Sequence, residues 1–130
     1  MVLHTIEKQK LIYEEFEPDV LRLAQILYNT YIEDNYELFI EVKIKTLIKV
    51  LKIQNHKNPI QYVKYLFEEL NEPLCVKNFK FFKNTYKMRF IYFCTYGFRN
   101  GSIDIELSEE YLYAIQNYMI DPYLQGMKNE

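Results

Sequence analysis

Basic and amide side chains are concentrated between residues 43 and 65, and their chemistry suits contact with nucleic acid. Lysine neutralises backbone phosphate, while asparagine and glutamine can each form two hydrogen bonds with adenine. A solvated basic face on a lysine-rich chain would show the same residue types, so the pattern leaves both interpretations open. The candidate contact residues are Lys43, Lys45, Lys49, Lys52, Lys57, Asn58, Gln61, Lys64 and Tyr65.

A second basic group surrounds the expected tip of a β-hairpin. Lys83, Lys87 and Arg89 lie close in the sequence to Tyr86. On a hairpin these side chains would form a cationic wing beside a DNA-binding helix. We therefore include the three cations among the candidate DNA contacts.

Charge is distributed unevenly along the chain, although the formal net charge is only −2. Residues 43–99 carry twelve Lys or Arg and three Glu, which gives +9, whereas residues 1–42 sum to −6 and residues 100–130 to −5. The local surface potential steers partners more strongly than the net charge does. A basic middle between acidic ends fits an anionic partner, unless folding intermixes the three segments.

Residues typical of catalytic or metal sites are sparse. The two histidines, His4 and His56, have no second ligand at a metal-binding spacing, and three glycines are too few for a phosphate-binding loop. Cys75 and Cys94 lie in apolar segments, where free cysteine is usually a core residue. We expect a protein that is not an enzyme and has no metal, cofactor or small-molecule substrate.

Hydrophobic periodicity predicts the elements that position these residues. Apolar spacing indicates helices over 3–16, from Pro18 to about Asp34, from a Thr46 cap through Leu51, from an Asn58 cap to Leu70, and after a Ser108 cap. A period of two predicts strands over 74–82, 86–98 and 102–107. The short, apolar and partly β-branched segment 38–42 is either a strand or an entry into the next helix.

The hairpin register is expected to follow from a turn centred on Asn84 and Thr85. Opposed residue numbers then sum to 169, which places Cys75 opposite Cys94. Residues 90–94 are apolar on both faces, and such a strand in a small domain favours a partner, for example a second copy through the sheet. The aromatic residues between Phe79 and Phe98 are either core or a stacking platform for single-stranded nucleic acid.

This order of elements predicts an α+β fold of winged-helix class. Its parts are a helix-turn-helix core, a three-stranded β hairpin or wing, and flanking N- and C-terminal helices. We expect one domain over residues 1–130, with its core at about 18–120. The chain shows no export signal and no apolar run of the ~20 residues that a membrane span needs, so we expect a cytoplasmic protein without membrane contact.

Four tracts give the chain a family resemblance. They are Val42–Ile53 (VKIKTLIKVLKI), Tyr62–Leu70 (YVKYLFEEL), Pro73–Val76 (PLCV) and Gly101–Leu112 (GSIDIELSEEYL). Together with a preceding helix at Leu21–Asp34, this pattern resembles the N-terminal winged-helix domain of plasmid replication initiator (Rep) proteins. The resemblance implies DNA replication through binding of an origin, dimerisation through this domain, and no catalysis.

One departure from that family concerns length. The family carries a second winged helix, and this sequence ends at Glu130 without one. The expectation is either a fragment or a stand-alone relative with a different task.

The alternative function is a small cytoplasmic protein-binding protein, such as a toxin-neutralising immunity protein or a phage inhibitor. Tyrosine anchors would then supply the binding energy. Its contact set would be acidic: Glu33, Asp34, Glu37, Glu109 and Glu110.

Overall fold

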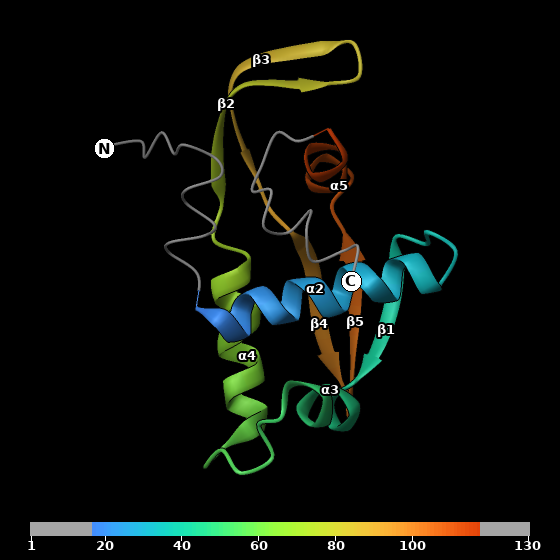
Figure 1. Cartoon of the computed structure of the whole chain (residues 1–130), viewed down its shortest axis with the longest axis vertical. Coiled ribbons are helices and arrows are strands. Elements are labelled where there is room, and N and C mark those ends of the chain that lie inside the picture. The colour runs from blue at the N-terminus through green and yellow to red at the C-terminus, as the bar shows by residue number, and fades with distance from the viewer. Residues whose placement is uncertain (1–16, 118–130) are drawn as a thin grey trace.

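Four helices and five strands make up residues 17–117, the part of the chain that the computed structural model describes (Figure 1). In chain order they are α2 (Pro18–Glu33), β1 (Phe39–Lys43), α3 (Ile44–Leu51), α4 (Pro59–Leu70), β2 (Leu74–Phe81), β3 (Asn84–Ile91), β4 (Cys94–Arg99), β5 (Ser102–Leu107) and α5 (Glu109–Gln116). The predicted helix at 3–16 lies outside the described residues. The α+β class is confirmed.

The helices begin where the sequence supplies start signals. Pro18 and Pro59 occupy the first turns of α2 and α4, where a missing N–H costs nothing. The Asn58 side chain accepts a hydrogen bond from the Gln61 N–H and caps α4, as predicted. The predicted apolar face of α4 is buried in the core: Val63, Leu66, Phe67 and Leu70.

The start of α3 differs from the Thr46 cap that the sequence suggested. The helix begins at Ile44, and its N-cap residue, Lys43, lies three residues before Thr46 and makes no side-chain cap. The Ile44 N–H instead donates to the Gly101 carbonyl at 2.9 Å. A turn distant in sequence therefore satisfies an N–H at the start of the helix, which no local signal could reveal.

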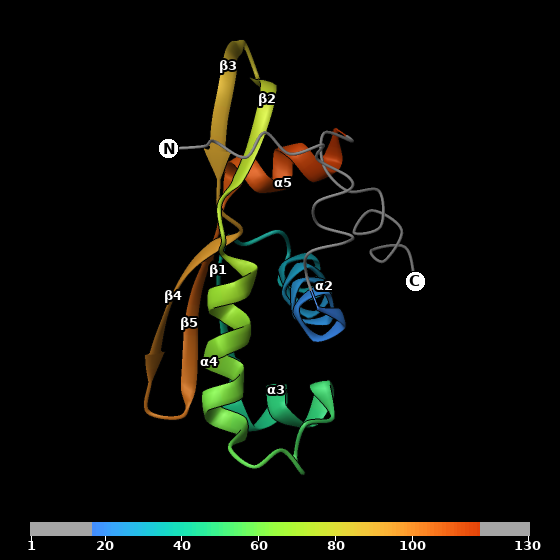
Figure 2. The same cartoon turned by 90° about the vertical axis from the view of Figure 1, so that its left-hand side faces the viewer.

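Three antiparallel strands form the first sheet, in the order β1-β5-β4. Ile103, Ile105 and Leu107 of β5 are buried, and the residues between them are exposed, as the alternation predicted. The helices α2 and α3 lie on one side of this sheet (Figure 2). The opposite face carries Phe39, Glu41, Asp104 and Glu106, which are exposed among residues 17–117.

The second sheet is the two-stranded hairpin β2-β3, and its register corrects the prediction. Its turn is formed by Phe82 and Lys83, so opposed numbers sum to 165; Cys75 pairs with Phe90, and Cys94 pairs with Leu107 in the other sheet. The predicted and observed registers differ by an even number of residues, so both keep each side chain on the same face. Alternation alone could not distinguish the two registers.

The predicted strand at 86–98 is also two strands. The chain leaves the hairpin after Ile91 and enters the first sheet at Cys94. Phe93, between them, is buried against the Tyr111 ring at 4.7 Å, while Phe90 and Tyr92 stay exposed. The apolar character on both faces thus reflects a change of sheet, and it gives no independent support for a second copy.

Helix α5 connects the hairpin to the rest of the fold. The Ser108 hydroxyl accepts from the Tyr111 N–H and caps it, as predicted. Leu112 and Ile115 are buried as expected, and Met119 lies outside the described residues. Most aromatics of the Phe79–Phe98 run pack on the core. No described helix is long and apolar enough to cross a membrane.

Candidate nucleic-acid interface

The end of the molecule at the bottom of Figure 1 is built from α3, the connection to α4 and the start of α4. Leu47 and Leu51 bury one face of α3, and Lys52 ends the helix in a left-handed conformation with φ 61°. The connection then turns through residues 53–58 to the capped start of α4. Two packed helices are thereby joined by a short turn.

Six lysines and no acidic residue occur between residues 43 and 67. All six side chains are exposed, and none forms an ion pair with another described residue. Uncompensated cations on one surface raise the local positive potential. The lysines of this surface are Lys43, Lys45, Lys49, Lys52, Lys57 and Lys64.

The two amide residues of the candidate set lie at the start of α4. Both Asn58 and Gln61 are exposed. The Asn58 Oδ1 atom accepts from the Gln61 N–H at 3.4 Å. The Nδ2 group of Asn58 makes no hydrogen bond with a described residue. This cap fixes the direction of α4, and the Gln61 side chain is the freer of the two amides.

Further along α4 the candidate residues already have protein partners. The Lys64 ammonium lies 5.3 Å from the centre of the Phe98 ring of β4. The Tyr65 hydroxyl donates to Glu17 at 2.5 Å, and this bond raises the pKa of Tyr65 to about 12. Glu68 follows on the same helix, and Glu72 lies just after its end. The basic surface therefore ends near the middle of α4.

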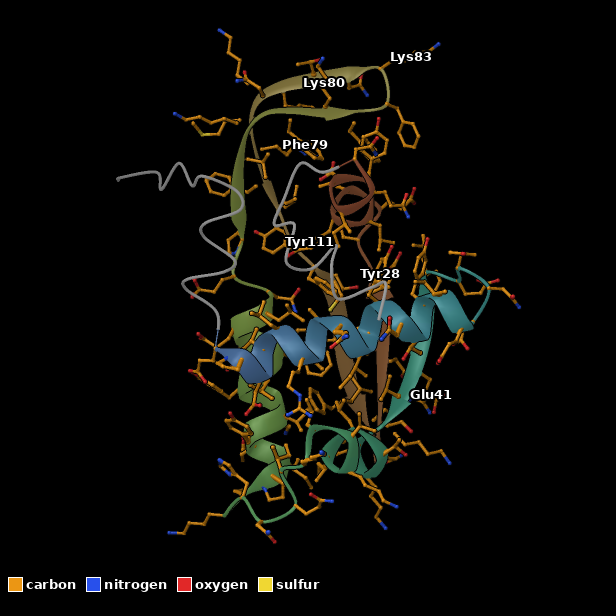
Figure 3. All side chains as sticks on the ribbon, in the orientation of Figure 1. Tyr28, Glu41, Phe79, Lys80, Lys83 and Tyr111 are labelled. Carbon is orange, nitrogen blue, oxygen red and sulfur yellow. The ribbon has the colours of Figure 1, made fainter. Side chains whose placement is uncertain are left out.

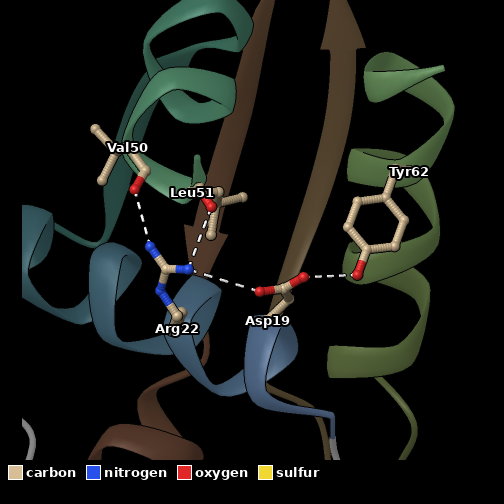
Figure 4. A network of polar contacts seen from close by, with 5 residues as sticks. All are labelled: Asp19, Arg22, Val50, Leu51 and Tyr62. Carbon is tan, nitrogen blue, oxygen red and sulfur yellow. Dashed lines mark hydrogen bonds and ion pairs between the residues drawn. The ribbon is translucent and has the colours of Figure 1, made fainter. Parts of the chain in front are cut away.

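A polar network connects α2 with both helices of this end (Figure 4). Asp19 accepts from the Tyr62 hydroxyl at 2.7 Å, and burial together with this bond raises the pKa of Tyr62 to about 12. Arg22 donates to the carbonyls of Val50 and Leu51 at the end of α3. Sequence reasoning missed Asp19 and Arg22 because their role depends on how α2 packs.

The rings of His56, Tyr62 and Tyr65 stack in a row along α4. The centres of His56 and Tyr62 lie 4.3 Å apart, and those of Tyr62 and Tyr65 lie 5.9 Å apart. His56 also accepts a weak 3.4 Å bond from the Asn58 N–H. The stack holds the α3–α4 connection against α4 and gives His56 a positional role.

The β4–β5 turn lies at the same end as α3. Its Gly101 carbonyl accepts from the first N–H of α3, as described above, and Gly101 adopts a φ of 84° that favours glycine. Arg99 beside it forms two hydrogen bonds with Asp104. Arg99 thereby lowers the pKa of the Asp104 carboxyl and is itself largely neutralised.

The structure does not bring the hairpin cations to this end. Lys83 and the hairpin tip lie at the top of Figure 3, whereas α3 and the start of α4 lie at the bottom. Lys83 and Lys87 are exposed. Arg89 is engaged within the protein, because it pairs with Glu110 at 2.7 Å and lies 4.6 Å over the Tyr86 ring.

The described part of the chain contains few groups suited to metal or thiol chemistry. No group of three His, Cys, Asp or Glu side chains in this part of the chain could hold a metal. Burial raises the pKa of the Cys94 thiol to about 11, which makes it a poor nucleophile at neutral pH. Comparisons with family models, with curated proteins and with solved structures found no match.

Proposed function

We propose that this protein is a winged-helix domain that binds double-stranded DNA through α3, the connection after it and the start of α4. One observation carries the proposal. Exposed lysines of β1, α3 and the connection, none of which forms an ion pair with another described residue, precede the capped start of a helix that follows another helix after a short turn. Lysine-phosphate contact supplies most of the affinity of such surfaces.

The chain order supports the winged-helix interpretation. Without the hairpin, the elements run α2, β1, α3, α4, β4, β5 and α5, and the three strands form a sheet in the order β1-β5-β4. In this interpretation α3 and α4 form the helix-turn-helix and the β4–β5 turn is the wing. The hairpin β2-β3 is then an insertion between α4 and β4.

In the proposed complex the start of α4 enters the major groove. The N-terminal residues of a recognition helix lie nearest the bases, which assigns base contact to Gln61 and Asn58. Lys49, Lys52 and Lys57 contact phosphate on either side. The resemblance to plasmid replication initiators extends the proposal to binding of a replication origin by a homodimer.

The first test is anisotropy of a labelled random-sequence duplex at several salt concentrations. If all six lysines contact phosphate, log K should fall against log salt with a slope of about −5, or about 10³-fold between roughly 50 and 200 mM salt. Replacing Lys49, Lys52 and Lys57 with glutamine should reduce the slope by about 3.

The matched control uses the hairpin lysines. Replacing Lys80, Lys83 and Lys87 with glutamine removes the same charge from the hairpin β2-β3, which lies at the opposite end of the molecule (Figure 1). On a short duplex this control should leave the slope unchanged. An equal loss in both variants would contradict the proposed placement, and no binding at low salt would remove the DNA function.

A further inference from the structure

A hollow lies where the chain passes from the hairpin into the first sheet and from that sheet into α5. It has a volume of about 420 Å³, within the range of ligand-binding pockets. Phe81 and Tyr92 form its wall on the hairpin side, Thr95 and Glu106 come from β4 and β5, and Glu109 comes from α5.

Backbone hydrogen bonds fix the frame of this hollow. The Ser108 N–H donates to the Phe93 carbonyl at 3.0 Å, which connects the start of α5 to the end of the hairpin. The Leu107 N–H donates to the Leu38 carbonyl at 2.9 Å, which connects β5 to the segment before β1. The hollow is therefore largely formed before any partner arrives.

The charge inside the hollow is negative and not compensated. Glu106 and Glu109 are exposed and form no ion pair with any residue between 17 and 117. A third carboxylate, Glu110, is neutralised by Arg89. Two free carboxylates beside low-dielectric walls attract cations and repel phosphate.

Aromatic surface adjoins the carboxylates. Tyr92 is 52% exposed at the hollow, and Phe39 is 70% exposed directly opposite Glu106 in the sheet register. Thr95 pairs with Glu106 on its other side. Phe39, Glu106 and Thr95 thus form a row on the exposed face of the first sheet that leads into the hollow. Exposed large aromatics next to charge are typical of protein-binding surfaces.

We propose that this hollow and the adjoining row bind a basic segment of a partner protein. An arginine or lysine of that segment enters the hollow, where the Glu106 and Glu109 carboxylates neutralise its charge and the Tyr92 ring contacts its stem or head. Neighbouring apolar residues of the segment cover Phe39. The inference does not depend on DNA binding, because none of the lysines of the basic surface lines the hollow.

The test is a titration of the ¹⁵N-labelled full chain with a blocked peptide of alternating arginine and glycine, followed by NMR. Amide shifts should localise to Tyr92, Thr95 and Glu106–Glu110. The double variant Glu106→Gln with Glu109→Gln should weaken binding about tenfold, as expected for two lost ion pairs at a partly exposed site. Tyr92→Ala should weaken it as well.

The matched control is Glu68→Gln with Glu72→Gln, which removes two exposed charges outside the hollow, one on α4 and one just after its end. This control should bind the peptide like the parent protein. Equal weakening in both double variants, or shifts spread over the surface, would overturn the proposal. The mass of the protein in solution tests whether a second copy occupies the hollow. A parent protein that is a dimer, with a Glu106→Gln and Glu109→Gln double variant that is a monomer, would overturn the proposal and assign the hollow to a second copy.

Discussion

Asn71 shows how a single side chain connects two parts of this fold. Its Oδ1 atom accepts from the Cys94 N–H at 2.8 Å, and its Nδ2 group donates to the Phe67 carbonyl at 2.9 Å. Asn71 therefore ends α4 and at the same time holds the first residue of β4. Cys94 is buried, so its N–H has no solvent to replace the bond.

At the residue scale we expect Asn71→Ala to lower the free energy of unfolding by about 1–3 kcal/mol, because a buried N–H loses its acceptor. Urea unfolding measures the change. Asn117→Ala is the matched control, since Asn117 makes only the analogous bond to the carbonyl four residues earlier. The control should lose less than about 0.5 kcal/mol. An equal loss would show that the Cys94 bond contributes nothing.

Among the elements, α3 depends most on its neighbours. It has only eight residues, and isolated helices of this length are not stable in water. The Gly101 carbonyl accepts a hydrogen bond from the first N–H of α3. Arg22 of α2 donates to the last two carbonyls of α3, those of Val50 and Leu51 (Figure 4). Both ends of the helix that carries Lys45 and Lys49 are thus held from outside.

At the element scale we expect Arg22→Ala to destabilise α3 first. Its amides should exchange faster with solvent, and the free energy of unfolding should fall by about 1 kcal/mol, because the hydrogen bonds from a half-exposed guanidinium are lost. Hydrogen exchange followed by NMR measures both effects. Lys45→Ala removes the same charge from an exposed site without a bond and should change stability by less than about 0.5 kcal/mol. If α3 exchanges alike in both variants, the Arg22 cap is not what holds it.

On the scale of the whole molecule, the hairpin projects from one end and α5 supports it. The Tyr113 ring lies 5.3 Å from the Phe81 ring and 4.7 Å from the Phe82 ring. The pair between Arg89 and Glu110 adds a polar connection. Few other contacts connect the hairpin to the other described elements. The stability of the hairpin therefore depends on its packing against α5.

We therefore expect Tyr113→Ala to loosen the hairpin while the first sheet stays intact. Amides of β2 and β3 should exchange faster, with an opening free energy lower by about 1–3 kcal/mol for two lost ring pairs. Amides of β5 should keep their protection. Tyr92→Ala removes a tyrosine that forms no ring pair within residues 17–117 and is the control. Uniform acceleration across both sheets would mean that the molecule opens as one unit.

Local signals in the sequence predicted much of the secondary structure. The Asn58 and Ser108 caps, the proline at the start of α2 and α4, and the alternation of β5 all depend on side chains within a few residues. The sequence alone can indicate such interactions, because both partners lie within a few residues of each other. The α+β class and the lysine-rich stretch without acids could be predicted for the same reason.

Only the tertiary structure decided which of these parts lie together. The hairpin register, the change of sheet after Ile91 and the placement of the hairpin and α3 at opposite ends depend on contacts between distant residues. The acidic hollow likewise joins the hairpin, the sheet and α5. An even shift in register keeps every side chain on its face, so alternation could not distinguish the alternatives. The sequence by itself determined the elements and their charges, and long-range packing determined the surfaces that they form.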